Sequence, residues 1–106
     1  MAHKIVKEWK TKAGPKAYVL LVHNTHYCGY VGIDKNHPWF EDNYNKHDDI
    51  NVHGGLTFSD KIDDIDEPWL FGFDAAHLGD TLENINVDYM ARECEKLAKQ
   101  IQEGEQ

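Results

Sequence analysis

The C-terminal segment carries one apolar stripe, and this stripe constrains the fold more than any other feature of the sequence. Its apolar residues recur every three or four positions, at Val87, Met90, Ala91, Cys94, Leu97, Ala98 and Ile101. That period predicts an amphipathic helix, which Asn86 can cap and Gly104 can end. A lone amphipathic helix must bury its stripe against another element, so the preceding residues must supply a sheet.

Short apolar and β-branched segments bounded by turn residues supply candidate strands for that sheet. We expect strands at about residues 5–9, 17–23, 26–33, 50–58 and 69–73. The first three are joined by short turns, which predicts an antiparallel meander, and the strongly apolar last one is expected near the middle of the sheet. The sequence therefore predicts a single α+β domain over residues 1–106, with an antiparallel sheet of about five strands and one C-terminal helix packed on one face.

Two segments lack a regular period and are expected to be loops. Residues 34–49 are long for a plain connector, which favours an irregular functional loop. Residues 59–67 are mostly acidic and are expected to be a solvated loop that ends at Pro68.

Charge and hydropathy exclude two classes of partner. The net charge of −8 argues against binding to duplex nucleic acid, which needs a basic face. No apolar run approaches the roughly 18–20 residues of a membrane helix. We also expect no signal peptide. Cys28 and Cys94 lie far apart and belong to no Cys-x-x-Cys pair, which favours two buried, reduced thiols and a cytoplasmic protein.

The charge is unevenly distributed along the chain. Residues 1–16 carry a charge of +4, and the remainder carries −12. These first lysines either form the cationic wall of an anion pocket or are simply solvated on an exposed hairpin.

A first block of chemically active residues runs from His53 to Thr57. Between them, Gly54 and Gly55 would let backbone amides approach an anion, to which the threonine hydroxyl adds a donor. The imidazole of His53 can act as an acid or a base near neutral pH. These four residues are candidates for holding a phosphate or a ribose. The alternative is a glycine bulge in a strand, with a hydrogen-bonded histidine beside it.

A second block, Asp74, His77 and Asp80, follows the last expected strand at intervals of three. Carboxylates and an imidazole at this spacing can hold a divalent metal, or a carboxylate can orient a catalytic imidazole. These three residues are candidate metal ligands, and Asp74 and His77 are also candidate ligand-binding residues. The alternative is a capped turn in which Asp74 accepts hydrogen bonds from backbone amides.

A third group lies in the irregular loop, where His37 and Pro38 precede Trp39, and Tyr44 follows. Aromatic side chains beside a histidine suggest a stacking surface for a nucleobase. The alternative is a loop that packs these side chains into a small core of its own.

Four blocks of the sequence resemble a widespread group of small, largely uncharacterised phage and prophage proteins. The blocks are GYVG at 29–32, HP at 37–38, HGGLTF at 53–58 and FGFDxAHxGD at 71–80. The resemblance covers roughly residues 27–101, and the acidic residues before Pro68 depart from the pattern. It implies a protein of the host-cell cytoplasm. In outline the chain also resembles counter-defence proteins that capture or destroy nucleotide immune signals.

Three functions follow as hypotheses. The first is binding of a phosphate-containing nucleotide, with no required cofactor, which would sequester an immune signal. The second is a hydrolase that cleaves a phosphodiester or glycosidic bond, with His53 and His77 as acid and base and Asp74 setting the tautomer of one imidazole. A metal-dependent version of this hydrolase would place the ion on Asp74, His77 and Asp80. The third is an acidic module that docks on a basic protein. We expect a homo-oligomer, because small domains often build ligand pockets between subunits.

Overall fold

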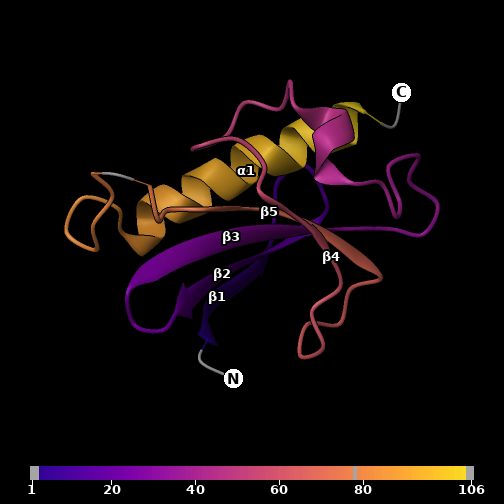
Figure 1. The fold of residues 1–106 in the computed structure, drawn as a ribbon. Helices are drawn as coiled ribbons and strands as arrows, with labels where there is room; N and C mark the ends of the chain where they lie inside the picture. Colours follow the sequence, from indigo (N-terminus) through magenta and orange to yellow (C-terminus); the bar gives the residue numbers. More distant parts are fainter. Residues whose placement is uncertain (1–2, 78, 105–106) are drawn as a thin grey trace.

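The computed structural model describes residues 3–77 and 79–104, which form one sheet and one long helix. The sheet is antiparallel, with strand order β1-β2-β3-β5-β4. Its strands are β1 (His3–Lys10), β2 (Lys16–Val22), β3 (His26–Ile33), β4 (Phe58–Asp60) and β5 (Trp69–Asp74). Helix α1 (Val87–Glu103) lies across one face of this sheet (Figure 1). The predicted α+β architecture is confirmed.

Helix α1 begins and ends where its sequence signals predict. The Asn86 side chain accepts a hydrogen bond from the backbone N–H of Tyr89, and the backbone N–H of Gly104 bonds carbonyls of the last turn. The buried face carries the apolar stripe, which packs on β2, β3 and β5 through Val19, Val31, Phe71 and Phe73. Residues far apart in the chain therefore share one core between helix and sheet.

The last expected strand does occupy an inner position in the sheet. β5 pairs with β3 on one side and with the short β4 on the other. Gly72 of β5 faces Tyr30 of β3, and a Cβ built there would lie 2.4 Å from the Tyr30 ring. That close approach explains the glycine within an otherwise apolar strand.

The prediction of a strand over residues 50–58 is wrong, since only Phe58 belongs to β4. Gly54 and Gly55 have φ angles of +70° and +78°, in the left-handed region that a strand does not use. The Gly55 N–H bonds the Val52 carbonyl at 2.8 Å and closes a tight turn. The glycine pair thus ends the extended run instead of forming a bulge within it.

The acidic segment is not the fully solvated loop that its charge predicts. Ile62 and Ile65 pack against the sheet face opposite α1, and Ile65 is buried. They join a second cluster that contains Tyr18, Leu20, Tyr30 and Leu70. Two isoleucines among the acids therefore cover part of the second face of the sheet.

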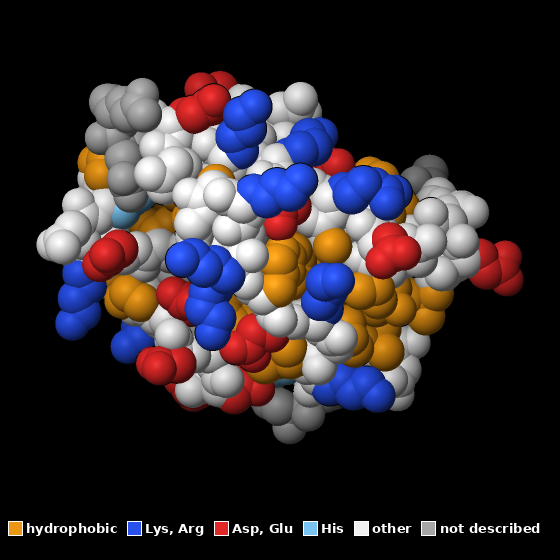
Figure 2. Space-filling view, turned by 180° about the vertical axis from the view of Figure 1, so that it is seen from behind, with side chains coloured by type: hydrophobic (Ala, Val, Ile, Leu, Met, Phe, Trp, Pro, Cys, Tyr) orange, Lys and Arg blue, Asp and Glu red, His pale blue; other side chains and the backbone are white. Residues whose placement is uncertain are grey.

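Three of the five lysines in residues 1–16 lie on the edge strand β1. Lys4, Lys7 and Lys10 are exposed, and Figure 2 shows lysine and arginine side chains spread over this side of the molecule, with hydrophobic side chains between them. β2 and β3 separate β1 from β5, so the two strands lie about 14 Å apart at the usual strand spacing. The predicted cationic wall therefore does not flank the residues that follow β5.

Cys28 and Cys94 are buried and free. Burial raises the pKa of Cys28 to about 11 and that of Cys94 to about 12. Among the described residues, no helix has both the length and the apolar character needed to cross a membrane.

Candidate functional site

The two histidine-containing blocks meet beside the first turns of α1. The His53 and His77 ring centroids lie 5.8 Å apart, although 24 positions separate the residues in the chain. Gly54 lies directly against the His77 ring, because a Cβ built on Gly54 would come within 2.2 Å of Cε1. The glycine beside His53 therefore makes room for the imidazole of the other block.

Asp80 joins the two imidazoles through one carboxylate oxygen. Its Oδ2 lies 2.8 Å from Nε2 of His53 and 3.3 Å from Nδ1 of His77, and it also accepts the His77 backbone N–H at 3.1 Å. The hydrogen bond from His53 contributes most to holding the pKa of Asp80 below its ordinary value. The carboxylate therefore stays ionised between the two rings.

His53 is fixed from α1 by two further hydrogen bonds. Its backbone N–H donates to Oε1 of Glu93 at 2.8 Å, and its Nδ1 lies 2.8 Å from the Tyr89 hydroxyl. When Nε2 carries the proton for Asp80, Nδ1 of the neutral ring accepts from this hydroxyl. Burial, with the charges of Glu93 and Asp80, raises the pKa of Tyr89, so the phenol keeps its proton.

The buried carboxylate of Glu93 also contacts Lys96, whose Nζ lies 3.3 Å from Oε2. These contacts tie the turn that carries His53 to the rigid start of the helix.

His77 is the most exposed member of the cluster, with 43% of its side chain accessible, against 18% for His53 and 12% for Asp80. Its Nδ1 faces Asp80 and lies 3.6 Å from Oδ1 of Asp74. Within the described part of the chain, Nε2 of His77 has no hydrogen-bond partner. This ring is therefore held on one side and accessible on the other.

Of the three metal ligands predicted from sequence spacing, only His77 and Asp80 belong to the group of residues that could hold a metal ion in the structure. The structure instead brings together one ligand atom from each of His53, His77 and Asp80, and these three atoms lie within 4.8 Å of one another. The Asp74 carboxylate instead accepts the backbone N–H of Ala76 at 3.2 Å and borders the group. His53 therefore takes the place predicted for Asp74, which sequence spacing could not indicate because His53 comes from the distant block.

Two backbone amides of the block predicted to bind an anion already have partners. The Gly55 N–H is used within its own turn, and the Thr57 N–H bonds the Gly72 carbonyl at 2.9 Å. The charged groups around the two imidazoles are mostly carboxylates, namely Asp74, Asp80 and Glu93. A phosphate would meet net negative charge here unless a cation accompanied it.

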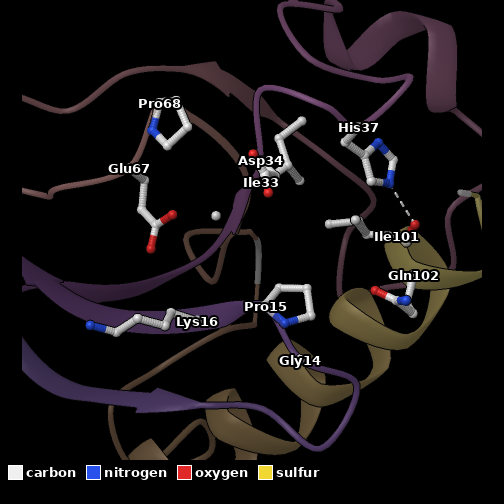
Figure 3. A pocket seen from close by; sticks show the side chains of 11 residues that line it. Gly14, Pro15, Lys16, Ile33, Asp34, His37, Glu67, Pro68, Ile101 and Gln102 are labelled. Carbon is white, nitrogen blue, oxygen red and sulfur yellow. Dashed lines mark hydrogen bonds between the residues drawn. The ribbon is translucent and has the colours of Figure 1, made fainter.

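The third predicted group lies at the other end of α1, beside the short 3-10 helix η1 (Tyr44–His47). His37 is buried, and its Nε2 lies 2.8 Å from the Ile101 carbonyl (Figure 3). Its Nδ1 accepts the Trp39 N–H at 2.9 Å. The helix rises about 18 Å between Tyr89, which contacts His53, and Ile101. The structure therefore separates His37 from the two-histidine cluster.

The aromatic side chains of this loop pack inward. Trp39 stacks on His47 with ring centroids 3.9 Å apart and meets Phe71 edge-on at 6.1 Å. Tyr44 packs against the core between helix and sheet. The loop thus extends the main core, and no aromatic ring of Trp39 or Tyr44 is placed to stack on a ligand at His77.

A hollow of about 380 Å³ opens beside His37, between the β1–β2 turn and the end of the acidic segment (Figure 3). Pro15, Ile33 and Pro68 contribute apolar walls, and Glu67 points into it while accepting the Tyr18 hydroxyl at 2.6 Å. This hollow shares no residue with the cluster of His53, His77 and Asp80.

Two residues of the site were not singled out by sequence reasoning. Tyr89 and Glu93 stand four positions apart at the start of α1, so they share one face of the helix. The feature that could have identified Glu93 is its polarity. It is buried in the helix, although a glutamate is rarely buried unless it has partners. A buried acid in the first turns of the expected helix could have pointed to a partner in another segment.

Comparison of the chain with protein-family models, with curated proteins and with solved structures found no significant match in any of the three. The resemblance to small phage proteins therefore stays a prediction, and the site is interpreted from its geometry.

Proposed function

We propose that the protein hydrolyses a phosphate-containing nucleotide at the cluster of His53, His77 and Asp80. The observation that carries this proposal is the convergence of two imidazoles on one carboxylate oxygen, with one imidazole exposed. Imidazoles held by carboxylates are suited to moving protons at neutral pH or to holding an ion that activates water. Hydrolysis needs proton transfer or an ion that activates water, whereas capture without turnover needs neither of them.

The surroundings favour hydrolysis over capture without turnover. Tight capture of a nucleotide would use cationic donors for the phosphate and an aromatic ring for the base. Here carboxylates border the imidazoles, and Trp39 and Tyr44 pack into the core at the far end of α1. Sequestration of a nucleotide immune signal, the first hypothesis from the sequence, therefore has less support than cleavage of such a signal.

The exposure and contacts of each residue indicate its role in the proposed reaction. His77 would contact the substrate or the attacking water, since it is the accessible ring. Asp80 would hold both rings, and His53 would be a positioning residue because both of its nitrogens already have partners. In the reaction, water would bond to the phosphorus or to the anomeric carbon, the bond to the leaving group would break, and the water proton would pass to the leaving group or to solvent.

The test uses the whole chain with cyclic dinucleotides and ADP-ribose derivatives in buffer that contains divalent cations. After incubation, the protein is heated to release bound material, and the nucleotides are separated by chromatography. New products are expected with the wild type and with a His3→Ala control, which removes an imidazole from the edge strand β1, where it contacts Asp64. His77→Ala should abolish them while leaving the melting temperature close to that of the wild type.

Two results would contradict hydrolysis. Recovery of intact nucleotide, bound tightly and released only on heating, would favour capture. No product and no change in melting temperature with any nucleotide would favour a protein partner, because a tight ligand must raise the melting temperature by mass action.

The cluster lies at the surface of one chain, so a second copy would be needed to enclose a bound nucleotide. The expected homo-oligomer is part of this proposal, and light scattering with and without nucleotide measures it. The host-cell cytoplasm, where such nucleotides occur, remains the proposed location.

A further inference from the structure

We propose that His53, His77 and Asp80 bind one divalent cation of the zinc type. The cation site stands on geometry alone, and only its role toward a phosphodiester rests on the proposed function.

The spacing is already close to that of a bound ion. A tetrahedral zinc site with bonds of about 2.0 Å places neighbouring ligand atoms about 3.3 Å apart. Oδ2 of Asp80 lies 2.8 Å from Nε2 of His53 and 3.3 Å from Nδ1 of His77. For an ion, the Asp80–His53 pair would have to open by about 0.5 Å, whereas the Asp80–His77 pair already has this spacing. The three ligand atoms lie within 4.8 Å of one another, and His77 has the exposure to move closer to His53.

The donor set selects the kind of ion. Two imidazole nitrogens and one carboxylate oxygen suit zinc and its first-row neighbours, whereas Mg²⁺ and Ca²⁺ prefer oxygen ligands alone. Three protein ligands also leave at least one coordination position open, as in catalytic sites and unlike closed structural sites. A water molecule or a phosphate oxygen would complete the coordination.

The start of α1 provides the outer contacts that such a site needs. With the ion on Nε2 of His53, Nδ1 carries the ring proton and donates it to the Tyr89 hydroxyl oxygen, which lies 2.8 Å away. Glu93 holds the backbone of the same histidine at 2.8 Å. On the other side, the absence of a Cβ on Gly54 leaves room for the His77 ring. The His53 imidazole is thus oriented before any ion binds.

The cation resolves the electrostatic difficulty of the site. Asp74, Asp80 and Glu93 would repel a phosphate, and a doubly charged ion among them would offset most of their charge and present a cation to the phosphate. The open position would then hold a phosphate oxygen, which makes a phosphodiester the better substrate than a glycosidic bond. His77 would be a ligand in this state, and a water molecule at a fifth coordination position of the cation would be the nucleophile.

Calorimetry on the full chain without an affinity tag, freed of metal by a chelator, tests the site. We expect about one ZnCl₂ per chain, no comparable binding of MgCl₂, and visible absorption bands of tetrahedral cobalt when CoCl₂ replaces zinc. His77→Ala and Asp80→Asn should each weaken zinc binding strongly, while His3→Ala, on the edge strand β1, should leave it unchanged. Tyr89→Phe keeps all ligands and should weaken it by about 10–100-fold through the lost outer contact.

Absence of zinc binding, or binding that survives both His77→Ala and Asp80→Asn, would overturn the inference. Its failure is distinguishable from failure of the proposed function. Zinc binding without any nucleotide product would refute hydrolysis and leave the cation site standing. Product formation that persists in excess chelator would refute the role of the cation in the reaction and leave hydrolysis standing.

Discussion

Replacing Gly54 by alanine tests whether the contact between Gly54 and His77 positions the His77 ring. A Cβ on Gly54 would lie 2.2 Å from Cε1 of His77, whereas ordinary contacts begin at 3.4 Å, so the ring would have to move by about 1.2 Å. Alanine at φ +70° also costs roughly 1–2 kcal/mol in backbone strain. The substitution should therefore both destabilise the fold and displace His77.

Gly55→Ala is the matched control for this substitution. Gly55 has φ +78°, and no heavy atom lies within 4 Å of the place that a Cβ would take there, so alanine brings the same backbone strain without a collision. Urea unfolding should show a loss of roughly 1–2 kcal/mol for Gly55→Ala and a larger loss for Gly54→Ala, which adds the collision to the strain. Only Gly54→Ala should also shift the His77 ring signals in proton NMR and weaken zinc binding.

A double-mutant cycle isolates the contact between Gly54 and His77. In a His77→Ala background the collision is gone, so Gly54→Ala should cost no more than Gly55→Ala does. If the two glycine variants behave alike in unfolding, in NMR and in zinc binding, then the Gly54 contact does not position His77, and the reasoning is refuted.

Three further predictions follow from buried and titrating groups. Because burial raises the pKa of Cys28 to about 11 and of Cys94 to about 12, neither thiol should react with a thiol reagent at pH 8 until urea unfolds the chain; fast labelling of folded protein would contradict their burial. Asp80 has a lowered pKa, so its stabilisation is present above its ordinary value of 3.8 and is lost as pH falls through the lower folded value. In chelator, Asp80→Asn should therefore be less stable than the wild type at neutral pH, with a gap that closes in acid; a gap independent of pH would refute this. His37→Ala should cost about 2–4 kcal/mol in urea unfolding, since two hydrogen bonds are lost at a buried position, and zinc affinity should not change.

The sequence by itself determined the class of the fold. The period of the stripe from Val87 to Ile101 reports one helix face, and the alternating or apolar segments before it report strands, because both signals arise from burial of neighbouring side chains. The same local information failed at residues 50–57. There the left-handed backbone of Gly54 and Gly55 outweighed an apolar pattern that resembles a strand.

The membership of the site was decided only by the tertiary structure. Sequence spacing grouped Asp74 with His77 and Asp80, and placed His37 and Trp39 among the candidates for the same pocket. Packing of α1 on the sheet brings Tyr89 to His53 at one end of the helix and Ile101 to His37 at the other.

The physical reason is that the chemistry of a side chain depends on the residue itself, whereas a binding site depends on the distances between residues of different segments. Residues 24 positions apart, His53 and His77, come into contact because a glycine turn and a post-strand loop both end at the first turns of α1. No periodicity in the chain encodes that contact; the fold creates it.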